Sequence, residues 1–262
     1  MTDALKLDSL NISAPPTQEV GLETPHVEKE DEAKCPASGA IPSDTTATCP
    51  VTGASLHEDP TAQEIDPELL RTSINARMAY LKDFLGFGKP QQDILNKTSP
   101  LIYGSIPEVV DGLYSKLFEF DVTKQIFMER NEGFDGPLPA KLEDLTLDSP
   151  QLVYRKIFMK AWARRIITAD YSSPKTWAYL DKVGIMHTGV KSFKHRAHAK
   201  PLIVPYRDCA LALGWVCDVL QTAILQLPDD KLSMQEKIEA ISAITKVIWI
   251  QNDLFARHYI NE

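Results

Sequence analysis

The sequence predicts an all-α protein, and three observations support this prediction. From Asp66 onward, apolar residues recur every three or four positions, the spacing that places them on one face of a helix. Segments begin with start signals such as Asp66-Pro67-Glu68, in which an N-cap, a proline and an acidic residue follow one another. No segment shows a convincing alternation of polar and apolar residues, which is typical of strands. We therefore expect about eight helices.

The expected helices follow one another from residue 66 to residue 261. The first, 66–87, ends at Gly86-Phe87-Gly88, because glycine favours helix ends. The others are expected at residues 90–103, 106–120, 122–130, 150–169, 174–190, 203–227 and 233–261. A loop rich in Gly and Pro and a basic connector are expected at residues 131–148 and 191–200.

The chain divides into two parts of different composition. Its 262 residues carry a net charge of -8. Residues 1–60 hold eleven acidic and three basic side chains, which account for this charge, and no aromatic residue. Such a segment cannot bury enough apolar surface to offset its ordering entropy. We expect a disordered acidic tail at residues 1–62 and one compact domain at residues 63–262.

Deleting residues 1–60 should therefore leave the fold and any bound cofactor unchanged. The tail should be cleaved readily by proteases, because composition of this kind leaves the backbone accessible. Thermal melts of the full and shortened chains check this prediction. A large fall in melting temperature on deletion would contradict it.

Composition also limits the class of protein. An acidic chain argues against a nucleic-acid binder, which usually has a basic domain. We expect no membrane span, because no apolar run approaches the roughly 18–20 residues that one needs, and the N-terminus lacks a secretory signal. Cys209 and Cys217 lie about 12 Å apart on one expected helix, beyond disulfide reach. These observations favour a cytoplasmic protein.

One histidine lies where chemistry can be expected. In the expected helix 174–190, Leu180, Val183 and His187 share one apolar face, and Gly184 lies one turn before the histidine. An imidazole on an apolar face suits an axial iron ligand, and the missing side chain of Gly184 would admit a large planar group. The alternative is a core histidine that binds a backbone carbonyl.

Several motifs together resemble the protoglobins and the globin domains of globin-coupled sensors. They are V-G-I-M-H at 183–187, then the basic connector, P-Y-R at 205–207, and D-G-L-Y-S-K-L-F at 111–118. The resemblance covers about residues 66–260 and implies a globin fold with an extra N-terminal helix. It implies heme b as cofactor, with His187 as the proximal iron ligand.

The resemblance also implies a pocket around that heme. Tyr114 matches the tyrosine that faces the distal side, where its hydroxyl could donate a hydrogen bond to a bound gas. A core tyrosine that binds a carbonyl is the alternative. The expected heme-lining residues are Tyr114, Phe118, Phe127, Phe158, Trp162, Val183, Trp215 and Val216. The sequence departs from the family at Ala212, where a phenylalanine is expected, so the contribution of Trp215 and Val216 rests on position alone.

Two basic or cysteine-containing segments allow more than one interpretation. The connector at 191–200 could pair with heme propionates or be a solvated loop. Cys35-Pro36 and Cys49-Pro50 begin two copies of C-P-x-[ST]-G-A. Such Cys-Pro pairs resemble heme-responsive motifs, but a duplicated linker or a docking motif would look the same.

The expected function is a heme-binding globin that reversibly binds O₂, NO or CO for sensing, storage or detoxification. Two alternatives remain at this point: a heme-free globin-fold interaction module, and a heme enzyme that acts on a small molecule. No electron donor or acid–base pair for such an enzyme is evident in the sequence. A separate signalling or reductase partner and a homodimer are the partners that we consider.

Overall fold

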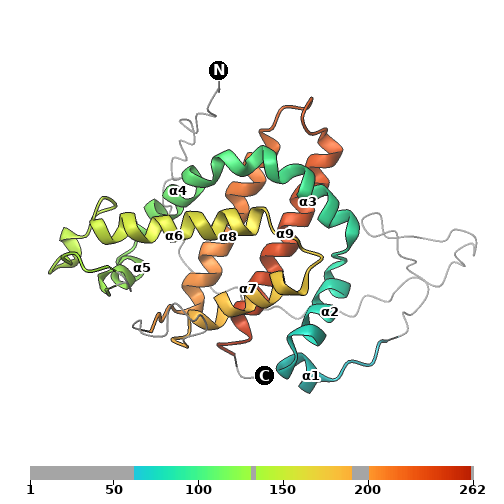
Figure 1. Ribbon diagram of the computed structural model, residues 1–262, viewed down its shortest axis with the longest axis horizontal. Helices are drawn as coiled ribbons and strands as arrows, with labels where there is room; N and C mark the ends of the chain where they lie inside the picture. Colours follow the sequence, from blue (N-terminus) through green and yellow to red (C-terminus); the bar gives the residue numbers. More distant parts are fainter. Residues whose placement is uncertain (1–61, 131–133, 191–200, 261–262) are drawn as a thin grey trace, which may run out of the picture. The chain divides into compact units, whose positions relative to one another are not determined.

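The structure is a computed structural model that describes residues 62–130, 134–190 and 201–260 (Figure 1). Within these ranges the chain consists of helices and the loops that connect them. The α-helices are α1 (Pro67–Thr72), α2 (Ile74–Leu85), α3 (Lys89–Ile102), α4 (Ile106–Phe118), α5 (Asp121–Lys124), α6 (Pro150–Ile167), α7 (Pro174–Met186), α8 (Tyr206–Leu225) and α9 (Met234–Ala256). These ranges contain one isolated antiparallel bridge, Thr188–Ile203, and no strand. The all-α prediction is confirmed.

The first expected helix is divided into α1 and α2, which corrects the prediction of one helix over 66–87. Ser73 has an extended backbone, and its hydroxyl accepts a hydrogen bond from the Ala76 amide at 3.3 Å. This contact makes Ser73 the N-cap of α2, because serine offers the backbone an alternative to a continuous helix. Gly86 ends α2 in the left-handed conformation, with φ 59°.

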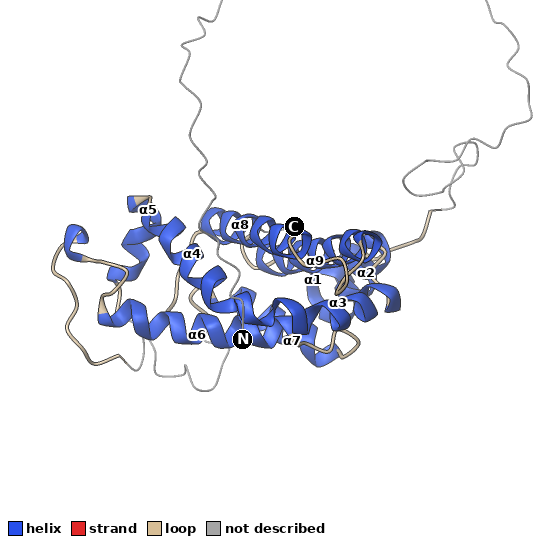
Figure 2. Cartoon of the chain, turned by 90° about the horizontal axis from the view of Figure 1, so that it is seen from above, coloured by secondary structure: helices blue, strands red, loops and turns tan. Residues whose placement is uncertain are grey.

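The long helices form two layers within the unit Gln63–Glu262. Figure 2 shows α8 and α9 in one layer and α6 and α7 in the other. The contacts agree, because α9 packs against α3, α7 and α8, and α4 packs against α6 and α8. A paired charge holds α2 on α9: Arg77 donates to both carboxylate oxygens of Asp253, at 2.6 and 2.8 Å.

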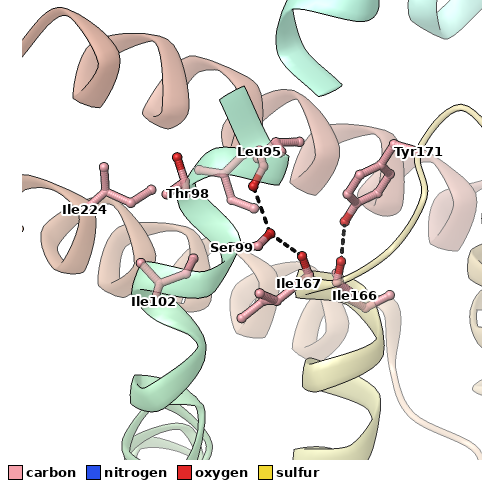
Figure 3. A pocket seen from close by; sticks show the side chains of 9 residues that line it. Leu95, Thr98, Ser99, Ile102, Ile166, Ile167, Tyr171 and Ile224 are labelled. Atoms are coloured by element: carbon pink, nitrogen blue, oxygen red, sulfur yellow. Dashed lines mark hydrogen bonds between the residues drawn. The ribbon is translucent and has the colours of Figure 1, made fainter. Parts of the chain in front are cut away.

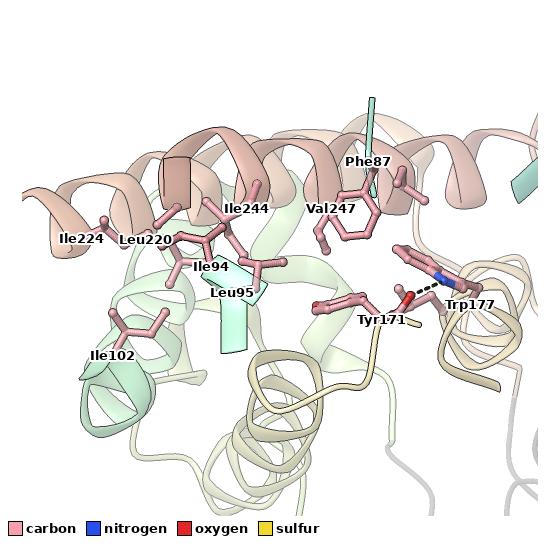
Figure 4. Close-up of a cluster of buried hydrophobic side chains, with 14 of the residues drawn as sticks. Phe87, Ile94, Leu95, Ile102, Tyr171, Trp177, Leu220, Ile224, Ile244 and Val247 are labelled. Atoms are coloured by element: carbon pink, nitrogen blue, oxygen red, sulfur yellow. Dashed lines mark hydrogen bonds between the residues drawn. The ribbon is translucent and has the colours of Figure 1, made fainter. Parts of the chain in front are cut away.

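The largest buried apolar cluster lies among α3, α7, α8 and α9. Its labelled members in Figure 4 are Phe87, Ile94, Leu95, Ile102, Tyr171, Trp177, Leu220, Ile224, Ile244 and Val247. The indole nitrogen of Trp177 donates to the Tyr171 carbonyl at 3.1 Å, so its polar atom is satisfied inside the core. This cluster fixes α7, the helix that precedes His187, on α9.

Helix α8 differs from expectation in its composition. By its length of 20 residues and its apolar composition alone, α8 could cross a membrane, whereas we expected no such stretch from the sequence. Of this stretch 28% is buried in the structure, and α8 packs along α9.

Candidate functional site

His187 lies at the C-terminal end of α7 and is held by a backbone contact. Its Nδ1 lies 2.7 Å from the Val183 carbonyl oxygen, four residues earlier. Because a carbonyl can only accept, Nδ1 carries the proton, and the neutral imidazole has its lone pair on Nε2. A carbonyl contact of this kind orients the ring of a metal-ligating histidine, and it also occurs in a structural histidine. The bond therefore sets the tautomer without deciding between the two.

Two further contacts fix the position of His187. The Phe255 ring of α9 meets the imidazole edge to face, with ring centroids 5.0 Å apart. The Val204 amide, just before α8, donates to the His187 carbonyl at 2.9 Å. The imidazole is thus positioned by three separate parts of the chain: α7, α9 and the segment that leads into α8.

Apolar side chains from α7, α8 and α9 form a cluster next to His187, which we call the proximal cluster. Its buried members are Val183, Cys209, Leu213 and Phe255. Trp162 and Tyr179 pack against it. Burial raises the pKa of the Cys209 thiol to about 11, so this cysteine is a neutral core residue at physiological pH.

The role predicted for Gly184 was wrong, because this glycine makes room for a helix. A Cβ at Gly184 would lie 2.2 Å from the Leu254 carbonyl oxygen of α9 and 3.2 Å from Cδ2 of His258. The backbones of α7 and α9 therefore approach each other at this point, and only glycine permits that approach. The space predicted for a planar group beside the imidazole is filled by α9.

Tyr114 on α4 is a buried tyrosine whose hydroxyl has no hydrogen-bond partner within the described ranges. The residue is 4% exposed, and its ring centroid lies 5.4 Å from that of Phe127. Burial raises the pKa of Tyr114 to about 12, so the phenol remains a proton donor at neutral pH. The predicted alternative, a core tyrosine that binds a carbonyl, lacks its carbonyl here.

The neighbours of Tyr114 form a second cluster, which we call the distal cluster. Its buried members are Ile106, Val110, Tyr114, Phe127, Leu145 and Leu152. Phe118 packs against it, and its ring centroid lies 5.6 Å from that of Phe127. The structure therefore brings together Tyr114, Phe118 and Phe127, three of the predicted pocket residues.

Helix α6 contributes to both clusters. Met159 and Ala163 pack against the distal cluster, whereas Trp162 packs against the proximal cluster. The Trp162 indole nitrogen is buried and has no hydrogen-bond partner among the described residues. Phe158 is 47% exposed and is a member of neither cluster, and its ring centroid lies 4.9 Å from that of Tyr154. A heme contact for Phe158 stays a prediction.

The two predicted residues of α8 lie in different surroundings. The ring of Trp215 packs over Gly112 of α4, where a Cβ would be 2.9 Å from the ring. Val216 packs against the largest core cluster. Neither is a member of the proximal cluster, so a heme contact for them stays a prediction.

Leu213 and Phe255 are the residues that the sequence analysis did not select. Leu213 belongs to the proximal cluster together with Val183, whereas the sequence analysis expected Trp215 and Val216 of α8 to face this region. The spacing of Leu213 and Leu220 fits an apolar face, but α8 is apolar on more than one side, so its sequence does not show which side faces His187. The contact of Phe255 with His187 depends on how α9 crosses α7, which periodicity does not predict.

A small pocket lies elsewhere, among α3, the end of α6, α8 and α9 (Figure 3). Its polar side chains bind backbone carbonyls. Tyr171 donates to the Ile166 carbonyl at 2.9 Å, and Ser99 donates to the carbonyls of Leu95 and Ile167. Neither His187 nor Tyr114 lines this pocket. The connector at 191–200 and the Cys-Pro repeat lie outside the described residues.

Comparisons with known proteins identify the family. The sequence profile of the protoglobin family matches residues 74–262. The fold is similar to that of the globin domain of the Geobacter sulfurreducens globin-coupled sensor, with a TM-score of 0.51 and 18% identity. That match covers 70% of this chain and 98% of the sensor domain. No curated protein matches the chain significantly. With its all-α globin fold and a profile match over most of its length, the chain belongs to the protoglobin family.

Proposed function

We propose that this protoglobin binds heme b and that His187 would hold its iron through Nε2. When bound, heme supplies an iron that takes up O₂, NO or CO. The observation that carries the proposal is the setting of His187, whose imidazole lies beside the apolar proximal cluster and against the Phe255 ring. The contact of Nδ1 with the Val183 carbonyl orients the ring, and in the neutral imidazole it leaves the lone pair on Nε2.

The other residues present fit a large apolar group with polar edges. The proximal and distal clusters supply apolar walls, and α6 contributes to both. The Trp162 indole nitrogen is buried and has no hydrogen-bond partner in the described residues. The Tyr114 hydroxyl, on a side chain that is 4% exposed, makes no hydrogen bond in the same ranges. Donors of this kind are satisfied when a ligand accepts from them. The exposed ring of Phe158 would gain an apolar contact in the same way.

The gas is held, in this proposal, by the pocket's own hydrogen-bond donor. Tyr114 keeps its proton at neutral pH because its pKa is raised by burial. It can therefore donate to a polar gas molecule next to the apolar distal cluster. A hydrogen bond from Tyr114 would favour O₂ over CO, because CO is the less polar of the two when bound.

Replacing Tyr114 with Phe should speed the release of O₂. The variant loses one hydrogen bond, worth about 1–3 kcal/mol if it is charge-assisted, while the aromatic packing on Phe127 is kept. CO release should change much less. Stopped-flow measurement of both off-rates gives the answer, with Tyr171→Phe as a matched control because its hydroxyl binds a core carbonyl. Equal changes for both gases would indicate packing instead of hydrogen bonding.

A titration of hemin into the heme-free protein tests the proposed cofactor. We expect a Soret band that saturates at one hemin per chain. The heme-free interaction module predicts no saturable band. If the band appears, turnover assays with NO and with peroxide separate a gas-binding protein from a heme enzyme.

Partners beyond the gas follow from the same proposal. We propose a cytoplasmic protein that acts with a signalling or reductase partner or as a homodimer. Leu211 of α8 and Trp249 of α9 are 66% and 60% exposed, so each of these two neighbouring helices carries an exposed apolar side chain. Sedimentation velocity over a range of concentrations tests the homodimer.

A further inference from the structure

A short segment of chain crosses the end of α7 at His187. The Val204 amide donates to the His187 carbonyl at 2.9 Å, and Thr188 and Ile203 pair in an antiparallel bridge. We call residues 203–205 the proximal strap. Because the strap binds the backbone of His187 directly, a shift of the strap would move the backbone that carries the imidazole.

The sequence of the proximal strap keeps Val204 out of α8. A residue before proline disfavours the helical conformation, so Pro205 directs Val204 to an extended backbone. The amides of Asp208 and Cys209 bind the Pro205 carbonyl at 2.9 and 3.3 Å, so the hydrogen bonds of α8 begin at Pro205. The Val204 carbonyl can therefore accept a hydrogen bond from another part of the chain.

Tyr259, in the turn that follows α9, supplies the donor. Its hydroxyl donates to the Val204 carbonyl at 2.7 Å. The turn is fixed by its backbone, because the Tyr259 amide binds the Ala256 carbonyl at 2.9 Å. The hydroxyl also lies 3.9 Å from the Cys209 sulfur of the proximal cluster, and the Tyr259 ring centroid lies 5.6 Å from that of Tyr206. Burial raises the pKa of Tyr259, so the phenol keeps its proton and remains a donor at neutral pH.

We propose that Tyr259 is a positioning residue for the proximal iron ligand. One chain of hydrogen bonds runs from the Tyr259 hydroxyl to the Val204 carbonyl, and from the Val204 amide to the His187 carbonyl. These two bonds hold the backbone of His187 from the side of α8 and α9, while the Val183 carbonyl orients its imidazole. The inference rests on the proposed heme binding, because the imidazole is positioned for an iron only when heme is bound.

Resonance Raman spectra of the ferrous, gas-free protein test the proposal. Their iron–histidine stretching band reports the bond between the imidazole and the iron, which a merely structural tyrosine would leave unchanged. Tyr259→Phe keeps the ring that packs on Tyr206 and removes only the hydroxyl. We expect the band to shift and broaden in this variant. The rate of heme transfer to apomyoglobin should rise about two- to tenfold, as for the loss of one neutral hydrogen bond.

Two further variants serve as rescue and control. Incorporation of 4-aminophenylalanine at position 259 restores a donor and should return the band and the rate of heme loss toward those of the wild type. Tyr206→Phe is the matched control. Tyr206 packs against the same cluster, and its hydroxyl donates to Asn252 Oδ1 at 3.2 Å, so its hydrogen bond links α8 to α9 and ends outside the proximal strap. This variant should keep the wild-type band and rate.

Amide hydrogen exchange in the heme-free protein follows the proximal strap itself. The Val204 amide exchanges slowly while it donates to the His187 carbonyl, and NMR measures its rate. Exchange at Val204 should be about two- to tenfold faster in Tyr259→Phe, because the strap loses one hydrogen bond. The rate should be unchanged in Tyr206→Phe. This measurement needs no bound heme.

The outcomes separate the two proposals. Failure of the wild type to bind hemin would overturn the proposed function, on which this inference rests. Normal hemin binding with an unchanged iron–histidine band, or with unchanged exchange at Val204, in Tyr259→Phe would overturn this inference alone. Equal shifts of the band in Tyr259→Phe and Tyr206→Phe would also overturn it, because they would indicate a general loosening of the cluster.

Discussion

Replacing His187 with Ala is expected to abolish stable heme binding. The variant removes the nitrogen that we assign as the iron ligand, and it leaves a space bounded by Phe255 and Val183. Apolar contacts alone hold a prosthetic group less firmly than contacts with a ligand bond. The protein should be purified without a Soret band, or lose its heme to apomyoglobin rapidly. Added imidazole, which fits the space left by the side chain, should restore part of the spectrum.

A second histidine provides the control for this variant. His258 follows α9 and its Nε2 lies 2.8 Å from Asp181 of α7, so it links the same two helices. His258→Ala should keep the heme spectrum of the wild type. If His187→Ala keeps an unchanged Soret band and CO spectrum, His187 is not the ligand.

Replacing Gly184 with Ala should lower the stability of the domain markedly. The new methyl group would lie 2.2 Å from the Leu254 carbonyl oxygen, a backbone atom that cannot rotate away. The helices α7 and α9 must separate, at a cost of about 1–3 kcal/mol or more, as for other overpacked cores. For a domain of about 200 residues this lowers the melting temperature by about 2–4 °C per kcal/mol. Thermal melts followed by circular dichroism measure this change in melting temperature.

The same substitution in α8 gives the matched control. A Cβ at Gly214 meets nothing within 4 Å, so Gly214→Ala creates no clash. Alanine has the higher helix propensity, by up to about 1 kcal/mol, so this variant should be as stable as the wild type or more stable. Similar losses for both variants would show that the clash at Leu254 is not what limits position 184.

Helix periodicity predicted which elements form but not where they meet. It found the helices that became α3 to α9, because each has an apolar face. It missed the break at Ser73, where one serine hydroxyl caps α2 and interrupts the pattern. It also assigned Gly184 to a cofactor, since a missing side chain indicates close approach without showing what approaches.

The surroundings of the candidate residues were predictable where these residues lie on an apolar helix face. Tyr114 and His187 lie on such faces, and the structure places Tyr114 in the distal cluster and His187 against the Val183 carbonyl. Their roles toward heme stay predictions. Leu213 and Phe255 were missed because their contact with the proximal side depends on how α8 and α9 cross α7. Where two helices cross, residues that are far apart in the chain come into contact, and the spacing of apolar residues within one helix does not predict such contacts.

The absorption spectrum of the reduced wild-type protein, recorded with and without CO, tests the central claim most directly. If His187 holds heme in this chain, we expect a Soret band in the purified protein and a sharp, shifted band on addition of CO. A protein reconstituted with hemin should show the same shift. A wild-type chain that shows no Soret band after purification or reconstitution, or a band that does not respond to CO, would contradict the account.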